Sequence, residues 1–268
     1  MRRVGPDGPH TLDDDLLIEA DNLVVLPRLP DGAFDLIYVD PPFNTGRPRR
    51  RRELSYEDRH EDYPAFLEPR LVHARRLLAP HGTLYVHLDQ REAHYAKVML
   101  DGLFGRECFL NELIWAYDYG GKPRTRWPAK HDTILVYVRE AGRHWFDADA
   151  VEREPYMAPG LAGPEKAARG KMPTDTWWHT IVHTTGAEKT GYPTQKPEGI
   201  VRRMVAASSR PGGWCLDFFA GSGTLGAVCA QLGRRYVLVD SNPAAVEIAA
   251  RRLTHQEGQP DGRKEGQC

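Results

Sequence analysis

Apolar and polar positions along this chain alternate between two patterns, short apolar runs and longer segments of helical period. The runs "FDLIYVD" (34–40) and "TLYVHLD" (83–89) are nearly continuous in apolar residues. They are typical of parallel strands covered on both faces. Between them, residues 63–78 carry apolar side chains at helical spacing, and this pattern ends before Pro80 and Gly82. The pattern therefore predicts a strand, a helix and a second strand.

The same alternation covers most of the chain. Further strands are predicted at 16–20, 111–119, 132–138, 213–219 and 234–240. Further helices are predicted at 91–103, 197–209, 224–232 and 243–253, with a brief one that ends near Leu29. Strands that alternate with helices indicate an α/β fold with a doubly wound, mostly parallel sheet of Rossmann type.

The pattern also sets the expected domain boundaries. We expect one large domain over residues 12–253, with disordered segments at 1–11 and 254–268. Between 139 and 190 the periodicity is lost, and Pro, Gly, Trp and charged residues dominate. This segment is predicted to be an inserted recognition region rather than part of the core.

Composition is that of an ordinary globular protein. The 268 residues are 41% hydrophobic and 27% charged, with a net charge of −1. No apolar run approaches the roughly 18 residues that a membrane span needs, and no apolar segment follows the two N-terminal arginines. We therefore expect no membrane association, no secretory signal and a cytoplasmic location.

Cysteine and histidine spacing gives no sign of a disulfide framework or a metal site. The four cysteines are scattered and form no CxxC pair. His179 and His183 are four residues apart, as helical metal ligands can be, but no third ligand lies near them in the sequence. We therefore predict that the protein binds no metal.

Charge is unevenly distributed. The first basic patch has five arginines within six residues, Arg47, Arg49, Arg50, Arg51 and Arg52. The second, "GGKPRTRWPAKH" (120–131), has no acid, and its cations are Lys122, Arg124, Arg126 and Lys130. A charged run is usually a solvated surface. Two acid-poor patches, one of which carries Trp127, favour a polyanion such as DNA as partner.

A glycine-rich loop near the end of the chain has the spacing of a nucleotide-binding turn. In "DFFAGSGTLGA", Gly221, Gly223 and Gly226 form GxGxxG between a predicted strand and helix, and Asp240 follows 17 residues after Gly223. Such glycines let the backbone approach a ligand, and the acid can bind ribose hydroxyls. A dinucleotide and S-adenosylmethionine both fit. The chain ends soon after Asp240, which argues against a nicotinamide fold and makes an NAD-dependent oxidoreductase the weaker alternative.

The motif "DPPF" (40–43) suits chemistry on an exocyclic amine. The lone pair of such an amine is delocalised into the ring until acceptors hold its two hydrogens. Asp40 and a backbone carbonyl fixed by Pro41 and Pro42 can provide two acceptors, and Phe43 can stack on the base. Four more acids follow or end predicted strands, Asp21, Asp89, Asp217 and Asp240. Because carboxyl ends of parallel strands share one edge, we expect a site there.

Three motifs together resemble one enzyme family. "DPPFNTG" (40–46), "TGYPTQKP" (190–197) and "DFFAGSGT" (217–224) are similar to the β-class amino-methyltransferases of DNA, whose motif order is circularly permuted. The resemblance implies a catalytic loop of Asp40, Pro41, Pro42 and Phe43, and S-adenosylmethionine as cofactor. It implies that the cofactor is bound by Asp21, Lys196, Asp217, Phe219, Gly221, Ser222, Gly223 and Asp240.

The resemblance also implies a substrate and partners. Asp at the head of the Pro-Pro motif favours the N6 amine of a flipped adenine in double-stranded DNA, and N4 of cytosine is the alternative. A homodimer is suggested, while a restriction endonuclease of the same system stays open. Within the family this would be a bacterial protein associated with the nucleoid.

Overall fold

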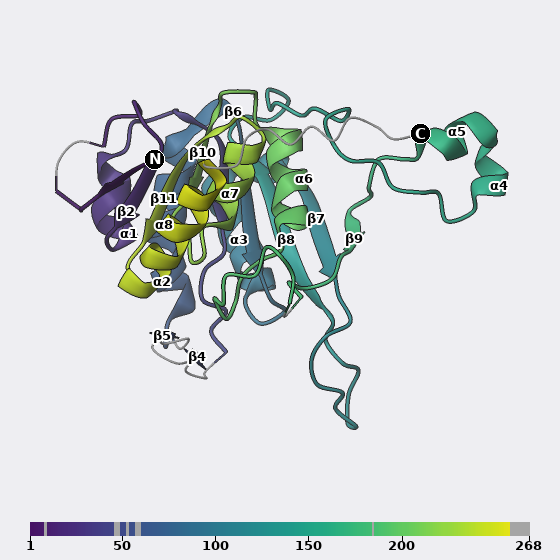
Figure 1. Cartoon of the computed structure of the whole chain (residues 1–268), viewed down its shortest axis with the longest axis horizontal. Helices are drawn as coiled ribbons and strands as arrows, with labels where there is room; N and C mark the ends of the chain where they lie inside the picture. Colours follow the sequence, from purple (N-terminus) through teal and green to yellow (C-terminus); the bar gives the residue numbers. More distant parts are fainter. Residues whose placement is uncertain (8–9, 46–48, 52–53, 57–59, 184, 258–268) are drawn as a thin grey trace.

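A nine-stranded sheet forms the centre of the computed structural model, which describes residues 1–7, 10–45, 49–51, 54–56, 60–183 and 185–257 (Figure 1). The strand order is β1-β2-β11-β10-β3-β6-β8-β7-β9. The strands are β1 (Arg2–Val4), β2 (Leu16–Glu19), β3 (Phe34–Val39), β6 (Leu78–Leu88), β7 (Phe109–Ala116), β8 (His131–Val138), β9 (Thr176–Trp178), β10 (Trp214–Asp217) and β11 (Arg235–Asp240). A separate antiparallel pair is formed by β4 (Arg49–Arg51) and β5 (Leu54–Tyr56).

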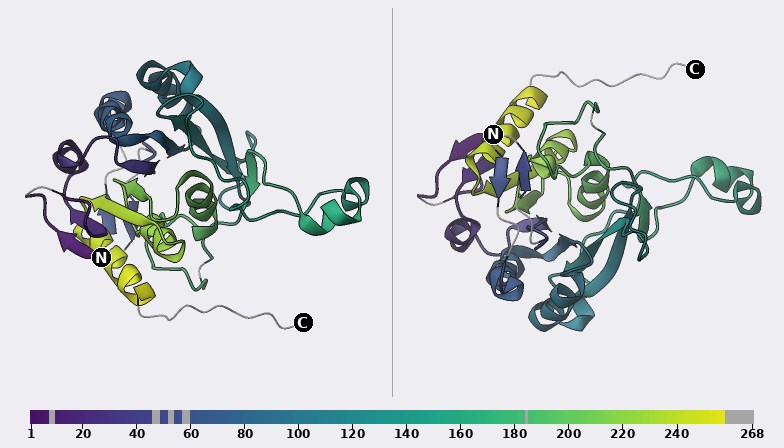
Figure 2. Two further views of the ribbon diagram at one scale, coloured as in Figure 1. Left: turned by 90° about the horizontal axis from the view of Figure 1, so that it is seen from above. Right: turned by 90° about the horizontal axis from the view of Figure 1, so that it is seen from below.

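Helices lie on both faces of the sheet. The helices are α1 (Asn22–Val25), α2 (Tyr63–Leu77), α3 (Ala93–Phe104), α4 (Pro159–Ala162), α5 (Pro164–Arg169), α6 (Glu198–Ser208), α7 (Thr224–Gln231) and α8 (Pro243–Glu257), with 3-10 turns η1 (Leu26–Arg28) and η2 (Arg106–Cys108). α2 and α3 lie on one face of the sheet, and α6, α7 and α8 lie on the other (Figure 2). Their buried side chains belong to two separate hydrophobic clusters. The predicted α/β fold with a mostly parallel, doubly wound sheet is confirmed.

The order of the strands brings distant segments together. From β1 to β6 every neighbouring pair is parallel, whereas β8 is antiparallel to both β6 and β7. β3 and β10 are neighbours, with Tyr38 opposite Asp217. The chain continues from β3 toward β6 and from β10 toward β11, so the winding changes direction between β3 and β10. Ligands of open α/β sheets bind outside the carboxyl ends of strands at such a point.

Both ends of the chain differ from the expected disorder. Residues 2–4 form the edge strand β1, parallel to β2, and Arg3 is held by Glu19 at 2.6 Å and Glu247 at 3.2 Å. A strand of two arginines and a valine has no apolar pattern, so its pairing could not be anticipated. At the other end α8 continues to Glu257, past Leu253. The expectation for the last residues, 258–268, falls outside the described part of the chain.

The segment 139–190 contributes one strand to the sheet. β9 pairs with β7, and Trp177 is 7% exposed, so this part of the segment is packed. The part that carries α4 and α5 forms an extension that projects from the body (Figure 1), whereas Ile181, Val182 and Lys189 return to line the cavity described below. No described helix is long and apolar enough to cross a membrane.

Candidate active site

A cavity of about 490 Å³ opens at the carboxyl ends of β3, β10 and β11. Its wall includes residues 40–43, 192–196, 217–222 and 240–242. The volume lies within the range of small-molecule sites. Four of the five strand-end acids line it, while Asp89 does not and instead accepts a hydrogen bond from the backbone of Arg91 at 2.9 Å. The predicted catalytic loop (40–43) and the glycine-rich loop (217–224) therefore share one cavity.

Asp40 is paired with a lysine from a distant part of the chain. It follows β3 directly, and its Oδ1 accepts a hydrogen bond from Lys196 Nζ at 2.6 Å. The two side chains are 16% and 11% exposed. The same ammonium lies 4.5 Å from the centroid of the Phe43 ring, a cation–π contact. Lys196 thus touches both side chains that the sequence assigned to base binding.

The chain bends sharply after Phe43. Asn44 has a φ of 55°, in the left-handed region that asparagine tolerates better than most residues. Its Nδ2 donates to Glu92 Oε1 at 2.8 Å, and its Oδ1 accepts from the backbone N–H of His60 at 2.8 Å. Hydrogen bonds to both ends of the amide hold this turn and aim the catalytic loop into the cavity.

A chain of buried polar side chains lies behind the catalytic loop. Tyr38 and His87 Nδ1 are 2.8 Å apart, and His87 Nε2 lies 3.1 Å from Asp132, which also accepts from Tyr117 at 2.9 Å. Burial would raise the pKa of Asp132, but the hydrogen bond and charge of His87 outweigh it and lower that pKa. No motif in the sequence predicted this set of contacts, although His87 is a visible exception within the apolar run "TLYVHLD".

The glycine loop wraps around the end of β10. The backbone N–H of Phe219 donates to Asp217 at 2.9 Å, and that of Gly221 donates to Asp240 at 2.7 Å. Gly221 has a φ of 49°, and a Cβ there would lie 3.0 Å from the ring of Tyr192, so a side chain would fill the cavity. Burial raises the pKa of Asp240, and burial together with the charges of Asp40 and Asp240 raises that of Asp217.

Gly223 has a different place from the one expected. It does not line the cavity but caps α7 at a φ of 71°, and a Cβ there would lie 2.9 Å from the Cβ of Ala249. Among the expected cofactor-binding residues it is therefore the one whose small size serves the packing of α7 on α8. Its left-handed backbone also favours glycine.

The wall near Asp21 is ordered by an arginine of α2. Arg70 donates to Asn22 Oδ1 at 2.7 Å, and Asn22 Nδ2 donates to the carbonyl of Phe218 at 2.9 Å. The guanidinium stacks 4.1 Å from the Phe66 ring and lies 3.9 Å from Asp21. These contacts tie α1, α2 and the glycine loop together. They join residues 48 and 196 positions apart, which no local pattern predicts.

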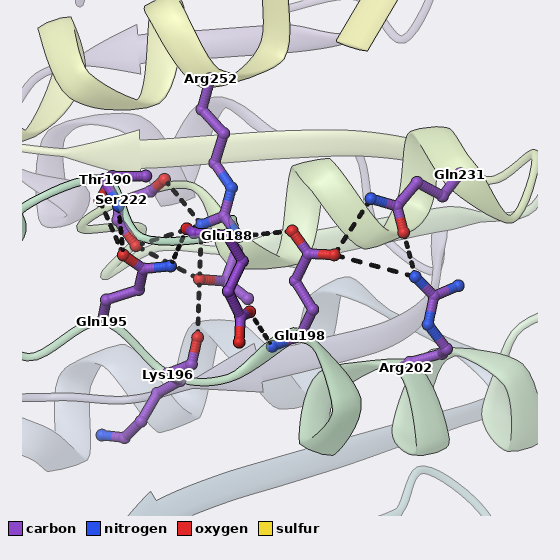
Figure 3. A network of polar contacts seen from close by, with 10 residues as sticks. Glu188, Thr190, Gln195, Lys196, Glu198, Arg202, Ser222, Gln231 and Arg252 are labelled. Carbon is purple, nitrogen blue, oxygen red and sulfur yellow. Dashed lines mark hydrogen bonds and ion pairs between the residues drawn. The ribbon is translucent and has the colours of Figure 1, made fainter. Parts of the chain in front are cut away.

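A polar network anchors the segment that carries Lys196 (Figure 3). The amide of Gln195 accepts from Thr190 and donates to the Glu188 carbonyl at 2.6 Å. The hydroxyl of Thr224 donates to the Lys196 carbonyl at 3.2 Å. In the same network Arg252 donates to Glu198 at 2.6 Å, to Thr224 at 3.0 Å and to Ser222. The backbone around Lys196 is therefore fixed to the glycine loop.

The cations of the second basic patch do not line the cavity. Residues 117–130, which we call the β7–β8 loop, project from the body (Figure 1). In this loop Lys122, Arg124 and Arg126 are exposed and Trp127 is 94% exposed, while Lys130 donates to the Gly120 carbonyl at 2.9 Å. Of the arginine run, Arg49, Arg50 and Arg51 belong to β4, and their side chains are not described. Arg47 and Arg52 fall outside the described residues.

Comparison with known proteins identifies relatives along nearly the whole chain. A family model described as DNA methylase, of the N6/N4 type, matches residues 34–251. The Type II methyltransferase M.HpaI of Haemophilus parainfluenzae is 32% identical over 90% of this chain and 74% of its own length. The DNA adenine methyltransferase YhdJ of Escherichia coli K12 is 29% identical over 88% of this chain and 82% of its own.

Solved structures of similar fold give the same picture. The cytosine-N4-specific PvuII DNA methyltransferase superposes with a TM-score of 0.70 over 91% of this chain and 87% of its own, at 16% identity. A complex of M1.HpyAVI with S-adenosylmethionine superposes with a TM-score of 0.61 over 88% and 98%, at 21% identity. At these identities the likeness establishes the fold.

Proposed function

The chain belongs to the family of DNA methylases that modify N6 of adenine or N4 of cytosine with S-adenosylmethionine, and from this premise we propose that it methylates the N6 amine of a flipped adenine in double-stranded DNA. The observation that carries the proposal is the shared cavity, which both Asp40 with Phe43 and the glycine loop line. A methyl donor and an acceptor amine can meet only if their binding residues share one space.

The cavity suits the cofactor. Asp240 uses one acceptor position on each oxygen, toward Gly221 and Asn242, and so keeps capacity for ribose hydroxyls. Gly221 leaves room beside Tyr192 that any side chain would take. The acids Asp40, Asp132, Asp217 and Asp240 favour a cationic ligand. Phe219 and Ser222 complete the wall, and the bound cofactor would supply an electrophilic methyl group on a sulfonium sulfur.

The catalytic loop suits an amine acceptor. Asp40 can accept one amino hydrogen and the carbonyl of Pro41 the other, which localises the lone pair on nitrogen. Pro41 is buried and Pro42 follows it, so the direction of that carbonyl is fixed. Phe43 can stack on the extruded base, which returns about 1–3 kcal/mol of the cost of flipping. Asp40 is also placed to receive the proton that nitrogen loses.

Adenine is the base that the relatives support better. YhdJ, whose similarity covers 88% of this chain at 29% identity, is an adenine methyltransferase, whereas the cytosine-N4-specific PvuII enzyme shares 16% identity. The Asp at the head of the motif favours the same base. For DNA contact we propose the exposed cations of the β7–β8 loop, with Lys130, and Arg47, Arg49, Arg50, Arg51 and Arg52. A homodimer and a restriction endonuclease partner stay predictions.

Methyl transfer from labelled cofactor to DNA, followed by mass spectrometry of the digested nucleosides, tests this function. We expect N6-methyladenine from the wild type. Asp40→Ala should lower the rate by about 10²–10⁴-fold, because the amine loses an acceptor, while cofactor affinity stays within a few fold. Asp89→Ala, a strand-end acid outside the cavity, is the matched control and should keep its rate. N4-methylcytosine as the product would contradict the adenine assignment.

A further inference from the structure

The Asp40–Lys196 pair leaves hydrogen-bonding capacity unused inside the cavity. Lys196 Nζ donates to Oδ1 of Asp40, and among the described residues no other hydrogen bond of either side-chain group is found. An ammonium has three N–H donors and a carboxylate has two oxygens, so two donors and the second oxygen, Oδ2, stay available. Both side chains line the cavity and are at most 16% exposed.

Unused donors and acceptors at this depth point to a ligand. A polar group removed from water without a partner costs free energy, and the cost is larger for a charged one. The bond between Asp40 and Lys196 uses only one of the three ammonium donors and one of the two carboxylate oxygens. What it presents to the cavity is an acceptor oxygen directly beside a donor nitrogen, because the two charged groups are 2.6 Å apart.

Adenine and cytosine carry the complementary arrangement. Each has an exocyclic N–H donor next to a ring nitrogen that accepts, N6 beside N1 in adenine and N4 beside N3 in cytosine. Guanine and thymine have the reverse order, a carbonyl oxygen beside a ring N–H. Guanine or thymine held in the same way would place its carbonyl oxygen against the Asp40 carboxylate, where the two oxygens repel each other. An acceptor–donor pair can therefore separate the amino bases from the carbonyl bases, much as a side-chain amide does on adenine.

The position of Lys196 suits this task. Its carbonyl is held by Thr224, and its neighbour Gln195 is 8% exposed and bonded at both ends of its amide. Figure 3 shows the Lys196 side chain leading away from that network, so only the stem and the ammonium are free to adjust. The ammonium also lies 4.5 Å from the Phe43 ring, on which the base is proposed to stack.

We propose that Asp40 and Lys196 together bind the amidine edge of the target base, with Asp40 Oδ2 accepting from the amino group and Lys196 Nζ donating to the adjacent ring nitrogen. Lys196 keeps its bond to Oδ1 and holds the carboxylate in place. The inference rests on the proposed methyl transfer to a DNA base. It moves Lys196 from the cofactor to the substrate and makes it a determinant of base specificity.

A single-atom change in the base tests the proposal. Two duplexes that carry the mapped target site differ only at the target, which is adenine in one and 1-deazaadenine in the other, where C–H replaces N1. Single-turnover methyl transfer is measured on both with the full-length wild type, Lys196→Met and Lys196→Arg. The wild type should prefer adenine by about 10- to 100-fold, the worth of a hydrogen bond to a charged donor.

The preference, and not the absolute rate, is the readout. Lys196→Met has no donor, so its preference should fall to near one even though both rates drop. Lys196→Arg should keep part of it. Because both enzymes meet the same two duplexes, the intrinsic reactivity of 1-deazaadenine cancels between them.

Two results would overturn the proposal. One is a wild type that methylates both duplexes at equal rates, which decides the matter even if Lys196→Met does not fold. The other is an equal preference in wild type and Lys196→Met, which would return Lys196 to the cofactor. If the product is N4-methylcytosine, the adenine assignment fails separately, and 3-deazacytosine in the same design then tests the pair. An enzyme that methylates no base contradicts the proposed function itself.

Discussion

The part-buried ion pair between Arg252 and Glu198 allows a stability prediction with a control on the same helix. Arg252 is 7% exposed and donates to Glu198 at 2.6 Å, to Thr224 at 3.0 Å and to Ser222 (Figure 3). Its neighbour Arg251 is 70% exposed and pairs with Glu247 at 3.0 Å. Methionine at either position keeps an unbranched helix former and removes the charge.

The expected magnitudes differ because burial differs. Arg252→Met removes the main cation of the Glu198 carboxylate, which is 19% exposed. We expect a loss of about 3 kcal/mol, the lower end of the range for a broken buried pair, because Gln231 still donates to Glu198 at 3.1 Å. Arg251→Met should cost less than about 1 kcal/mol, as exposed pairs do. For a chain of this size the first change lowers the melting temperature by roughly 6–12 °C.

Urea denaturation and thermal melting measure both variants. Glu198→Gln added to Arg252→Met should recover part of the loss, because it removes a charge whose remaining cation, Arg202, lies 3.8 Å away. Cofactor affinity by calorimetry should fall several-fold in Arg252→Met, since Ser222 lines the cavity. If the two arginine variants agree in unfolding free energy within about 0.5 kcal/mol, the network does not stabilise the glycine loop and the reasoning fails.

Three further predictions address pH dependence and DNA binding. Burial would raise the pKa of Asp35, but hydrogen bonds from Arg210 and His81 lower it. Its pH-linked contribution to stability is therefore complete above the unfolded pKa near 4 and is lost as pH falls through the lower folded pKa. In urea denaturation, Asp35→Asn should cost about 3 kcal/mol at pH 7, as a broken buried pair does, and less at pH 3. Because the pKa of Asp217 is raised in the folded state, its carboxyl group costs stability as pH rises above about 4. The free energy of unfolding of Asp217→Asn should therefore increase relative to that of the wild type between pH 5 and pH 8. Replacing the three exposed cations of the β7–β8 loop with Gln should lower the log–log salt slope of DNA binding by up to about 2.7, and an unchanged slope would make that loop a solvated surface.

Much of the fold follows from local sequence pattern, and the exceptions have physical causes. β3 and β10 are apolar because both faces of the sheet are covered, so their runs identify them. β1 and β9 are three-residue strands with polar or mixed side chains, and their pairing depends on neighbours elsewhere in the chain. Gly223 is a similar case. Its spacing matches a cofactor-binding loop, but the spacing does not reveal that its small size is needed for close packing against Ala249.

The position of the site could be predicted from the sequence, but most of the side-chain contacts within it could not. Strand-end acids and three motifs indicated one edge of the sheet, and the cavity lies there. The pair of Asp40 with Lys196 joins residues 156 positions apart, and that of Asp35 with Arg210 joins residues 175 apart. Contacts over such distances depend on which strands become neighbours, and a single sequence does not state the strand order.

The arrangement of β3 beside β10 has an electrostatic consequence that connects the two halves of the site. Parallel pairing sets Asp40 and Asp217 at one edge, with Asp132 and Asp240 in the same cavity, and the charges of Asp40 and Asp240 add to burial in raising the pKa of Asp217. Lys196 opposes this effect and acts on Asp132 and Asp217 as well as on Asp40. With Asp21, five acids line the cavity, against the three cations Arg70, Lys189 and Lys196. A cationic ligand would relieve the remaining repulsion between the carboxylates, whereas an anionic dinucleotide would add to it. The charge of this cavity therefore favours a sulfonium cofactor over the dinucleotide that the glycine spacing alone also permitted.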